Sequence, residues 1–413
     1  MGRTARNRND VLRPKPVQKI ELSSRKTGWR LLAVVLLLAV GAAALSYGVM
    51  NLFSSEPGWV EIEANAGALS VAGDFVFLYD VGVSGASATA EKRALTTLYT
   101  DLTRKAWQLF NNEETTEGVP GVRYLNDHPN EAVEVDPALY RALERAEASG
   151  SRYLYLAPIA DIYDNLFACE DDALAADFDP LLNDGLRRLF AEIAVFAANP
   201  EAARVELLGA NRVCLRVSDD YLAFARAEEL DGFIDFHWML NAFVIDYLAD
   251  ELTARGYTLA ALSSRDGFAR ALDGRDGASF SYNLYDRGYL AAVMSHTGAR
   301  SIVALRGYPL TNLDGDRYAV RRDGEIRVPY LDPADGLPRA AAADLVACAG
   351  DRGCADILLA LAPAYIADTL DRSALLALEG VQSILVADGT LLLSDPALTL
   401  SGLAEGYAAA PME

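Results

Sequence analysis

The sequence predicts an α+β protein: one domain of mixed β-sheets and packed helices, preceded by a single N-terminal transmembrane helix. Residues 31–53 are uncharged and mostly apolar, and about 20 such residues are enough to cross a bilayer as a helix. From residue 69 onward, segments with the two-residue alternation of strands interchange with segments whose apolar residues recur at helical spacing. Hydrophobic residues make up 52% of the 413 residues, so the chain can bury a large core.

The N-terminal 30 residues are basic and are predicted to remain in the cytoplasm. Residues 3–30 contain nine lysines and arginines but only two acidic residues, and basic flanks stay on the cytoplasmic side of a membrane helix. A cleaved signal peptide is the alternative, but the basic segment is too long for one, and no convincing small-x-small cleavage site follows. We therefore expect residues 31–53 to anchor the chain in the lipid bilayer of the cell membrane, with the remainder extracytoplasmic.

The composition argues against one class of partner and limits the role of cysteine. The formal net charge is -21 and the pI about 4.6, which argues against nucleic acid as a partner, because nucleic-acid binding depends on Lys and Arg that neutralise phosphates.

Four cysteines in a chain of this length do not form a disulfide scaffold. Cys348 and Cys354 flank a short loop outside the predicted membrane, so we expect a disulfide between them, with two free buried thiols as the alternative.

The extracytoplasmic part is expected to begin with a strand at residues 69–79 and a long helix at residues 89–110, for which Ser87 is the N-cap. Further helices are predicted at residues 137–148, 186–198 and 240–256. Further strands are predicted at residues 205–208, 212–217, 258–262, 280–285, 291–294, 300–304, 384–387 and 391–394. The chain therefore divides into a basic segment at 1–30, an anchor at 31–53, a linker at 54–68, a domain at 69–400 and a tail at 401–413.

The most informative stretch is residues 328–362. It begins with turn residues around Asp332 and Gly336, since Gly permits a positive φ and Asp bonds its own backbone. An alanine-rich segment at residues 341–347 follows and is interpreted as a buried strand, although so many alanines also suit a helix. An apolar helix then begins, with Asp356 in its first turn, where a carboxylate favours the positive end of the helix dipole.

This order of motifs resembles the C-terminal signature of the ApbE family, the FAD:protein FMN transferases. That family carries a His-x-x-Asp-Pro-x-x-Gly-x-Pro loop, a buried strand, and a helix that opens Ala-Asp-x-x-x-Thr. The matching positions are Asp332, Pro333, Gly336, Pro338, Ala355 and Asp356. Pro329 stands at the position of the loop His, and Ala360 stands at the position of the Thr.

The resemblance continues upstream, where the family has an Asp-Leu-Gly-Gly-Ile-Ala-Lys-Gly-Tyr-Ala-Val-Asp segment. Asp235 and Asp246 match its first and last residues. His237 and Trp238 replace the two glycines, and Asn241 replaces the lysine. The elements follow the family order over nearly the whole domain, which indicates a shared fold more firmly than a shared activity.

In that family, the pyrophosphate of FAD is cleaved with the help of Mg²⁺, and FMN is passed to a Thr or Ser of a membrane-associated protein. The resemblance implies that FAD and Mg²⁺ bind here, with Asp356 as a metal ligand. It also implies cofactor contacts from Asp332, Gly336, Trp238 and Asn241. Two structural interpretations remain beside these: Trp238 as a core residue, and Asp356 as a carboxylate that only stabilises a helix N-terminus.

Two functions from different classes therefore follow from the sequence. The first is a membrane-anchored, Mg²⁺-dependent FAD:protein FMN transferase whose acceptor is a membrane-associated flavoprotein. The second is a catalytically degenerate relative that binds a flavin or a protein partner. The replaced family positions favour the degenerate relative over an active transferase. These positions are Pro329, Ala360, His237, Trp238 and Asn241.

Overall fold

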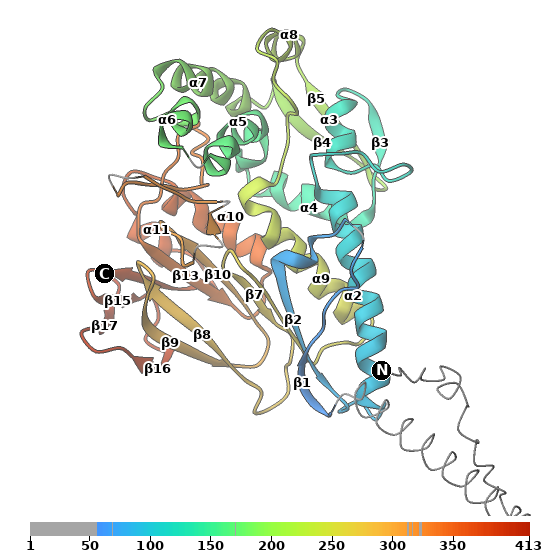
Figure 1. Ribbon diagram of the computed structural model, residues 1–413, viewed down its shortest axis with the longest axis vertical. Coiled ribbons are helices and arrows are strands. Elements are labelled where there is room, and N and C mark those ends of the chain that lie inside the picture. The colour runs from blue at the N-terminus through green and yellow to red at the C-terminus, as the bar shows by residue number, and fades with distance from the viewer. Residues whose placement is uncertain (1–55, 68, 170, 312–313, 316, 322–323) are drawn as a thin grey trace, which may run out of the picture. The chain divides into compact units, whose positions relative to one another are not determined.

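A nine-stranded mixed sheet organises the domain in the computed structural model, which describes residues 56–413 apart from 68, 170, 312–313, 316 and 322–323 (Figure 1). In order across the sheet, its strands are β1 (Gly58–Glu61), β2 (Phe75–Val81), β6 (Ala260–Ser264), β7 (Phe268–Ala271), β10 (Arg300–Arg306), β13 (Asp344–Ala349), β14 (Gln382–Ala387), β15 (Thr390–Leu393) and β17 (Ala408–Pro411). Neighbouring strands are antiparallel except β15 and β17, which are parallel. The predicted α+β class with mixed sheets is confirmed.

Helices cover one face of this sheet. The three that lie against it are α2 (Ala88–Phe110), α9 (Leu240–Ala254) and α10 (Cys354–Tyr365). On α2, the residues Leu95, Leu102 and Leu109 recur at helical spacing and are buried in the larger core. Helix α9 is buried along most of its length, because it contacts the sheet and both of the other helices, α2 and α10.

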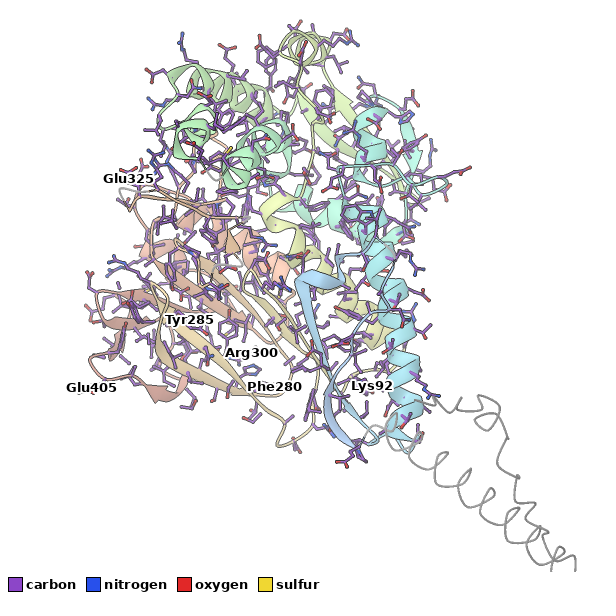
Figure 2. The ribbon with its side chains drawn as sticks, viewed as in Figure 1. Lys92, Phe280, Tyr285, Arg300, Glu325 and Glu405 are labelled. Atoms are coloured by element: carbon purple, nitrogen blue, oxygen red, sulfur yellow. The ribbon has the colours of Figure 1, made fainter. Side chains whose placement is uncertain are left out.

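A three-stranded sheet covers the opposite face over β10, β13 and β14. Its order is β16 (Thr399–Leu403), β9 (Tyr289–Thr297) and β8 (Ser279–Asp286). A second, smaller core fills the space between the two sheets and includes Leu284, Met294, Val346 and Ile384. Phe280 of β8, labelled in Figure 2, meets Trp59 of β1 edge to face, with ring centroids 5.9 Å apart.

A helical layer and a small sheet complete the domain at the end remote from β8 and β9 (Figure 1). The small sheet has the order β3 (Ala132–Glu134), β5 (Arg212–Val217) and β4 (Ala203–Gly209). The α-helices here are α3 (Val122–Asp127), α4 (Pro137–Ala148), α5 (Ala157–Ala168), α6 (Asp172–Ala175), α7 (Asp184–Ala198) and α8 (Asp219–Ala227). The remaining short elements are α11 (Arg372–Leu376), β11 (Ala319–Val320), β12 (Ile326–Arg327), and the 3₁₀ turns η2 (Val71–Asp74), η3 (Tyr153–Leu156), η4 (Ala176–Phe178) and η5 (His237–Met239).

The predicted helix starts are confirmed by their caps. The hydroxyl of Ser87 accepts a hydrogen bond from Ala90 N at 3.2 Å at the start of α2. The carboxylate of Asp136 accepts one from Ala138 N at 2.9 Å at the start of α4. In both cases a side-chain oxygen satisfies an N–H group that has no partner inside the helix.

Several predicted segment boundaries differ from the structure; the strand predicted at residues 69–79, for example, begins only at Phe75, after the 3₁₀ turn η2. The segment 54–68, predicted as a linker, contains β1, which pairs with β2 in the main sheet. The segment 401–413, predicted as a tail, contains β17 and part of β16. In the alanine-rich segment 341–347, β13 begins only at residue 344. Strands this short carry too few residues for their alternation to be recognised.

The predicted anchor at residues 31–53 and the basic segment before it lie outside the described residues. Within residues 56–413, leaving aside the gaps given above, no helix is long and apolar enough to cross a membrane. The anchor therefore stays a prediction from the sequence. The compact unit that the structure describes begins at Glu56 and ends at Glu413.

The predicted disulfide is wrong, because Cys348 and Cys354 are free thiols. Cys348 belongs to the small core between the two sheets, whereas Cys354 belongs to the large core beneath the helices. The main sheet therefore separates the two side chains. Each sulfur also has its own polar contact: Arg300 Nη1 lies 3.4 Å from Cys348 Sγ, and Cys354 Sγ lies 3.5 Å from Ile302 O (Figure 2 labels Arg300).

Candidate functional site

A cavity of about 550 Å³ lies beside the start of α9, where α2 ends. Its walls come from segments distant in sequence: the end of α2 and the loop after it, α5, residues 231–241, the β6–β7 turn, and residues 317–318 and 329–331. Its aromatic lining residues are Trp107, Phe110, Phe167, Trp238, Phe268, Tyr318 and Tyr330. Aromatic walls with a few convergent polar groups are typical of a small-molecule site.

Trp238 is held in the wall of this cavity by two tyrosines. Its ring centroid lies 5.5 Å from that of Tyr153 and 5.4 Å from that of Tyr330, both edge to face. Its indole Nε1 is buried and has no hydrogen-bond partner. The ring therefore makes the core contacts that one interpretation predicts, and it also lines the cavity as the cofactor interpretation requires.

Asn241 and Asp266 leave two acceptor atoms unsatisfied at the same cavity. Asn241 is 2% exposed, and its Nδ2 donates to Asp266 Oδ2 at 3.1 Å. Arg317 pairs with the same carboxylate oxygen at 2.8 Å. Asn241 Oδ1 and Asp266 Oδ1 are buried without a partner. An unpaired buried polar atom costs about 1–3 kcal/mol, so these atoms and the Trp238 indole need a partner that the protein does not supply, either a ligand or a bound water.

The turn before α9 has a strained backbone at His237. Its φ is +30°, a value that residues with a side chain rarely adopt, and the resembled family has glycine at this position. Asp235 Oδ1 accepts a hydrogen bond from His237 N at 3.1 Å, and the ring lies 3.2 Å from Tyr153 O. Burial lowers the pKa of His237 to about 4 and raises the pKa of Asp235 to about 6. The imidazole is therefore neutral at pH 7 and offers no positive charge to a phosphate.

The charge of the cavity is strongly negative. Among the described lining residues, seven carboxylates face two arginines. Both arginines already have acidic partners: Arg123 pairs with Asp127 at 2.9 Å and with Asp231 at 2.6 Å, and Arg317 pairs with Asp266. An incoming phosphate would therefore have to compete with a carboxylate for either guanidinium group.

The loop that contains Asp332 and Gly336 is a structural turn next to the cavity. The carboxylate of Asp332 pairs with Arg339 at 3.1 Å. Gly336 has φ +75°, and a Cβ added there would lie 2.5 Å from Cδ1 of Ile159, so this position needs glycine both for its backbone and for its packing. Residues 329–331, just before the loop, line the cavity, whereas Asp332 and Gly336 do not.

Asp356 does not belong to a set of side chains suited to a metal ion. It is 40% exposed, and its carboxylate lies 3.9 Å from Nε of Arg145. Arg145 also pairs with Asp246 at 3.3 Å and with Asp250 at 4.0 Å. Ala360, where the family has Thr, supplies no oxygen ligand. Among the residues that the structure describes, no three His, Cys, Asp or Glu side chains are arranged to hold a metal. Asp356 therefore has a cation, Arg145, beside it in place of further oxygen ligands, which is a poor arrangement for Mg²⁺.

Asp246 is the buried centre of this ion-pair network. It is 1% exposed and accepts hydrogen bonds from Cys354 N at 2.8 Å and Ala355 N at 3.0 Å. These are the first N–H groups of α10, so Asp246 caps that helix from a neighbouring helix. Arg270 pairs with Asp246 at 3.0 Å. A Cβ at Gly353 would overlap the Asp246 carboxylate, which explains the glycine before α10.

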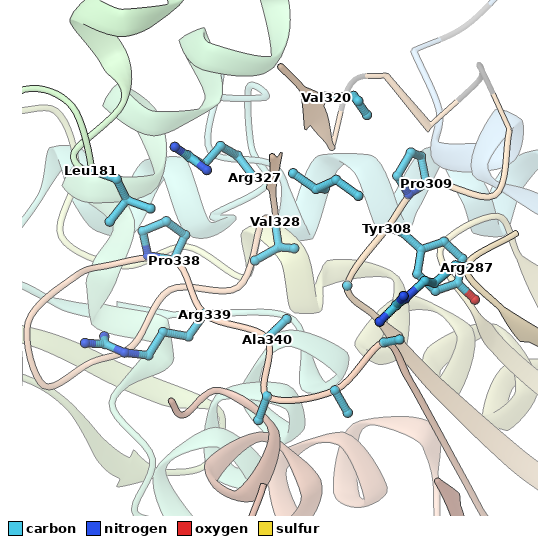
Figure 3. Close-up of a pocket in the computed structure, with 15 residues that line it drawn as sticks. Leu181, Arg287, Tyr308, Pro309, Val320, Arg327, Val328, Pro338, Arg339 and Ala340 are labelled. Atoms are coloured by element: carbon cyan, nitrogen blue, oxygen red, sulfur yellow. The ribbon is translucent and has the colours of Figure 1, made fainter. Parts of the chain in front are cut away.

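A second cavity, of about 600 Å³, is lined by residues 307–309 and 338–343 among others (Figure 3). Figure 3 shows Leu181, Val328 and Pro338 on one side and Tyr308 and Arg287 on the other. Its Arg327 donates to Asp179 at 2.8 Å, and its Arg339 pairs with Asp335. This cavity is not lined by any of the predicted site residues, which are Asp332, Gly336, Trp238, Asn241 and Asp356.

The comparisons with known proteins bear on the fold. The sequence matches no protein-family model and no curated protein. The ApbE protein of Thermotoga maritima aligns with 83% of this chain and 97% of its own, with a TM-score of 0.54 and 15% identity. The flavin transferase ApbE of Vibrio cholerae aligns with 85% of this chain and 99% of its own, with a TM-score of 0.52 and 11% identity. This chain has an ApbE-like fold.

At 11–15% identity, the likeness establishes the fold and leaves the chemistry to the residues themselves. The ApbE-like fold brings Trp238 and Asn241 together at one cavity, and their predicted contact with a cofactor stays a prediction. It places Asp332 and Gly336 in the adjacent turn, and Asp356 in an ion pair with Arg145.

Sequence reasoning missed three features of the site. Asp266 was not singled out from the sequence, although its carboxylate binds Asn241 in the cavity. The acidic side chains of α5 gave no signal, because an exposed Asp on a helix is usually solvated. Arg145 was also missed, since it is 101 residues away from Asp246 and only the fold brings them together. A covarying pair of positions is the signal that could have revealed the last contact.

Proposed function

We propose that this domain binds a flavin in the cavity beside α9 and does not carry out metal-assisted transfer of FMN. Three buried atoms without partners support it: Trp238 Nε1, Asn241 Oδ1 and Asp266 Oδ1, at an aromatic-walled cavity. An isoalloxazine ring presents flat faces to aromatic side chains. Its edge carries carbonyl acceptors and an N–H donor, which complement an unpaired indole N–H and unpaired oxygens.

Several positions that serve FMN transfer in the resembled family hold residues here that lack the required charge or ligand oxygen. Phosphoryl transfer depends on positioning and on neutralising charge, and losing one electrostatic group typically costs about 10²–10³ in rate. Asp356 faces the guanidinium of Arg145, and Ala360 offers no ligand. His237 is neutral at pH 7, and Asn241 stands where the resembled family has a lysine. Several such losses together favour a catalytically degenerate protein, although their effects need not add.

FAD:protein FMN transferase activity is the second candidate, and the observation that favours it is the fold shared with the solved flavin transferase of Vibrio cholerae. In that case FAD would be the substrate, Asp356 would contribute to a Mg²⁺ site, and a membrane-associated flavoprotein would accept FMN. The arrangement of Arg145 and Asp356 argues against it, because a metal ion there would have to displace a guanidinium.

The test is to incubate the full chain in detergent with FAD, with and without Mg²⁺, and to measure bound flavin and released AMP. We expect bound flavin, no AMP, and no effect of Mg²⁺. Release of AMP that Asp356→Ala abolishes would establish the transferase instead. Trp238→Ala should weaken flavin binding. The matched control is Trp59→Ala, because Trp59 is 45% exposed and lies outside the cavity.

We also propose that the domain is held at the outer face of the cell membrane by residues 31–53. The uncharged stretch and the basic excess before it support this arrangement.

A further inference from the structure

We infer that the cavity selects an uncharged flavin, riboflavin, over FAD. This inference rests on the flavin-binding function proposed above and adds which flavin is bound. Riboflavin and FAD share the isoalloxazine ring and the ribityl chain. They differ in that FAD continues into a dianionic pyrophosphate and an adenosine, so the walls of the cavity decide between them by their charge.

The carboxylates of the cavity oppose a pyrophosphate. They are contributed by Asp74, Glu113, Asp161, Asp164, Asp231, Asp235 and Asp266. Like charges within a cavity of low polarity repel more strongly than in water. The repulsion is already visible within the wall, because burial and the neighbouring charge of Asp231 raise the pKa of Asp161. A dianion would add to this repulsion.

The arginines that could offset this repulsion already form ion pairs with carboxylates. Arg123 is bound by Asp127 and Asp231, and Arg317 is bound by Asp266. His237, at the turn before α9, is neutral because burial lowers its pKa to about 4. A phosphate therefore gains a cation here only by releasing a carboxylate from it.

The unpaired atoms support the binding of a flavin ring, which riboflavin and FAD share, so the choice between the two rests on the charge of the wall. Asn241 is 2% exposed and lines the cavity, and its Oδ1 and the Oδ1 of Asp266 are both buried acceptors without a donor. Phosphate oxygens are acceptors only, so they cannot satisfy these two atoms. The single N–H of an oxidised flavin ring can donate to one of them, and a ring carbonyl can accept from the Trp238 indole.

The ribityl chain explains how the acidic wall can bind riboflavin although it repels the pyrophosphate of FAD. A carboxylate accepts hydrogen bonds and is well matched to hydroxyl donors, which the chain carries along its length. The same groups that oppose the pyrophosphate of FAD therefore favour the polyol of riboflavin. The wall thus discriminates between two ligands that share every other contact.

The experiment is isothermal titration of the full chain in detergent with riboflavin and with FAD. We expect riboflavin to bind at least about tenfold more tightly than FAD, which corresponds to about 1.4 kcal/mol. Raising the salt from about 50 mM to about 500 mM should strengthen FAD binding and leave riboflavin binding unchanged, because salt screens charge repulsion.

Asp161→Asn provides the sharper test, because it removes one charge from an exposed lining residue with little risk to the fold. It should narrow the difference between the two affinities by strengthening FAD binding. The matched control is Asp220→Asn, the same charge change on α8, away from the cavity. Asn241→Leu should weaken riboflavin binding by about tenfold, as expected for loss of one buried hydrogen bond.

The outcomes separate this inference from the function on which it rests. If FAD binds as tightly as riboflavin or more tightly, the preference for an uncharged flavin is wrong, but flavin binding stands. If Asp161→Asn and Asp220→Asn change FAD affinity equally, the acidic wall does not discriminate, and the inference fails. If neither flavin binds, the proposed function itself fails.

Discussion

Replacing Asp246 by Asn should destabilise the domain strongly, although the side chain keeps its size. Asp246 is 1% exposed, caps α10 through two backbone N–H groups, and pairs with Arg145 and Arg270. In the Asn variant, one of the two N–H groups loses its acceptor, and the amide group opposes it as a second donor. Both arginines lose their buried counter-charge at the same time.

The magnitude follows from these losses. Breaking a buried ion pair by removing one partner costs about 3–5 kcal/mol, because the other charge stays uncompensated. Arg145 and Arg270 are 34% and 20% exposed, so water can partly solvate them, and the lower end of that range applies. Asp250 pairs with the same two arginines but is 43% exposed. We therefore expect about 3 kcal/mol for Asp246→Asn and at most about 1 kcal/mol for the control Asp250→Asn.

The assay is urea unfolding of residues 56–413, followed by far-ultraviolet circular dichroism. The free energies of unfolding are compared through the midpoints, provided that the slope is unchanged. A double-mutant cycle with Arg270→Gln isolates the pairwise term. If Asp246→Asn costs less than 1 kcal/mol, or no more than Asp250→Asn, then Asp246 is not the residue that holds α10 in place.

Four further predictions concern packing, pH, metal and topology. Gly336→Ala should lower stability by about 2–4 kcal/mol without changing the flavin affinity of the folded protein, since its φ is +75° and a Cβ would clash with Ile159; unfolding and titration together check both parts. Burial raises the pKa of Asp344 to about 7, above its unfolded value, so the folded protein should lose about 2–4 kcal/mol of stability as the pH rises from 4 to 7. Asp344→Asn should remove this loss, and an unchanged pH profile in the variant would contradict it. Ala360→Thr alone should not produce Mg²⁺-dependent AMP release, because Arg145 still faces Asp356. Protease added to intact cells should digest residues 54–413, and protection until lysis would show that the predicted topology is wrong.

The fold could be predicted largely because its longer elements are locally consistent. Helix α2 has apolar residues at helical spacing and a Ser87 cap, so its start and its buried face were both predictable. The hairpin of β14 and β15 was predictable from its Asp-Gly turn. By contrast, β1, β16 and β17 owe their existence to pairing with distant strands, and a short segment with no local signal cannot reveal such a partner.

The site was predictable only where a motif marked it. Trp238 and Asn241 stand at positions that the family resemblance singled out, and both line the cavity. The disulfide prediction failed because sequence spacing does not say on which face of a sheet a residue lies, and Cys348 and Cys354 lie in different cores. Similarly, Asp356 was interpreted without its partner Arg145, which comes from a different helix.

The network around Asp246 connects the stability of the fold to the proposed absence of metal chemistry. An acidic cluster at the start of α10 needs positive charge, and a metal ion or an arginine can supply it. Here Arg145 and Arg270 supply it, and they also satisfy a carboxylate that caps the helix. A metal ion at Asp356 would compete with Arg145, and a shift of Arg145 would weaken the compensation of Asp246 as well. The arrangement that stabilises α10 therefore also competes with a divalent ion at Asp356, so we expect that restoring a single ligand does not by itself produce a metal site.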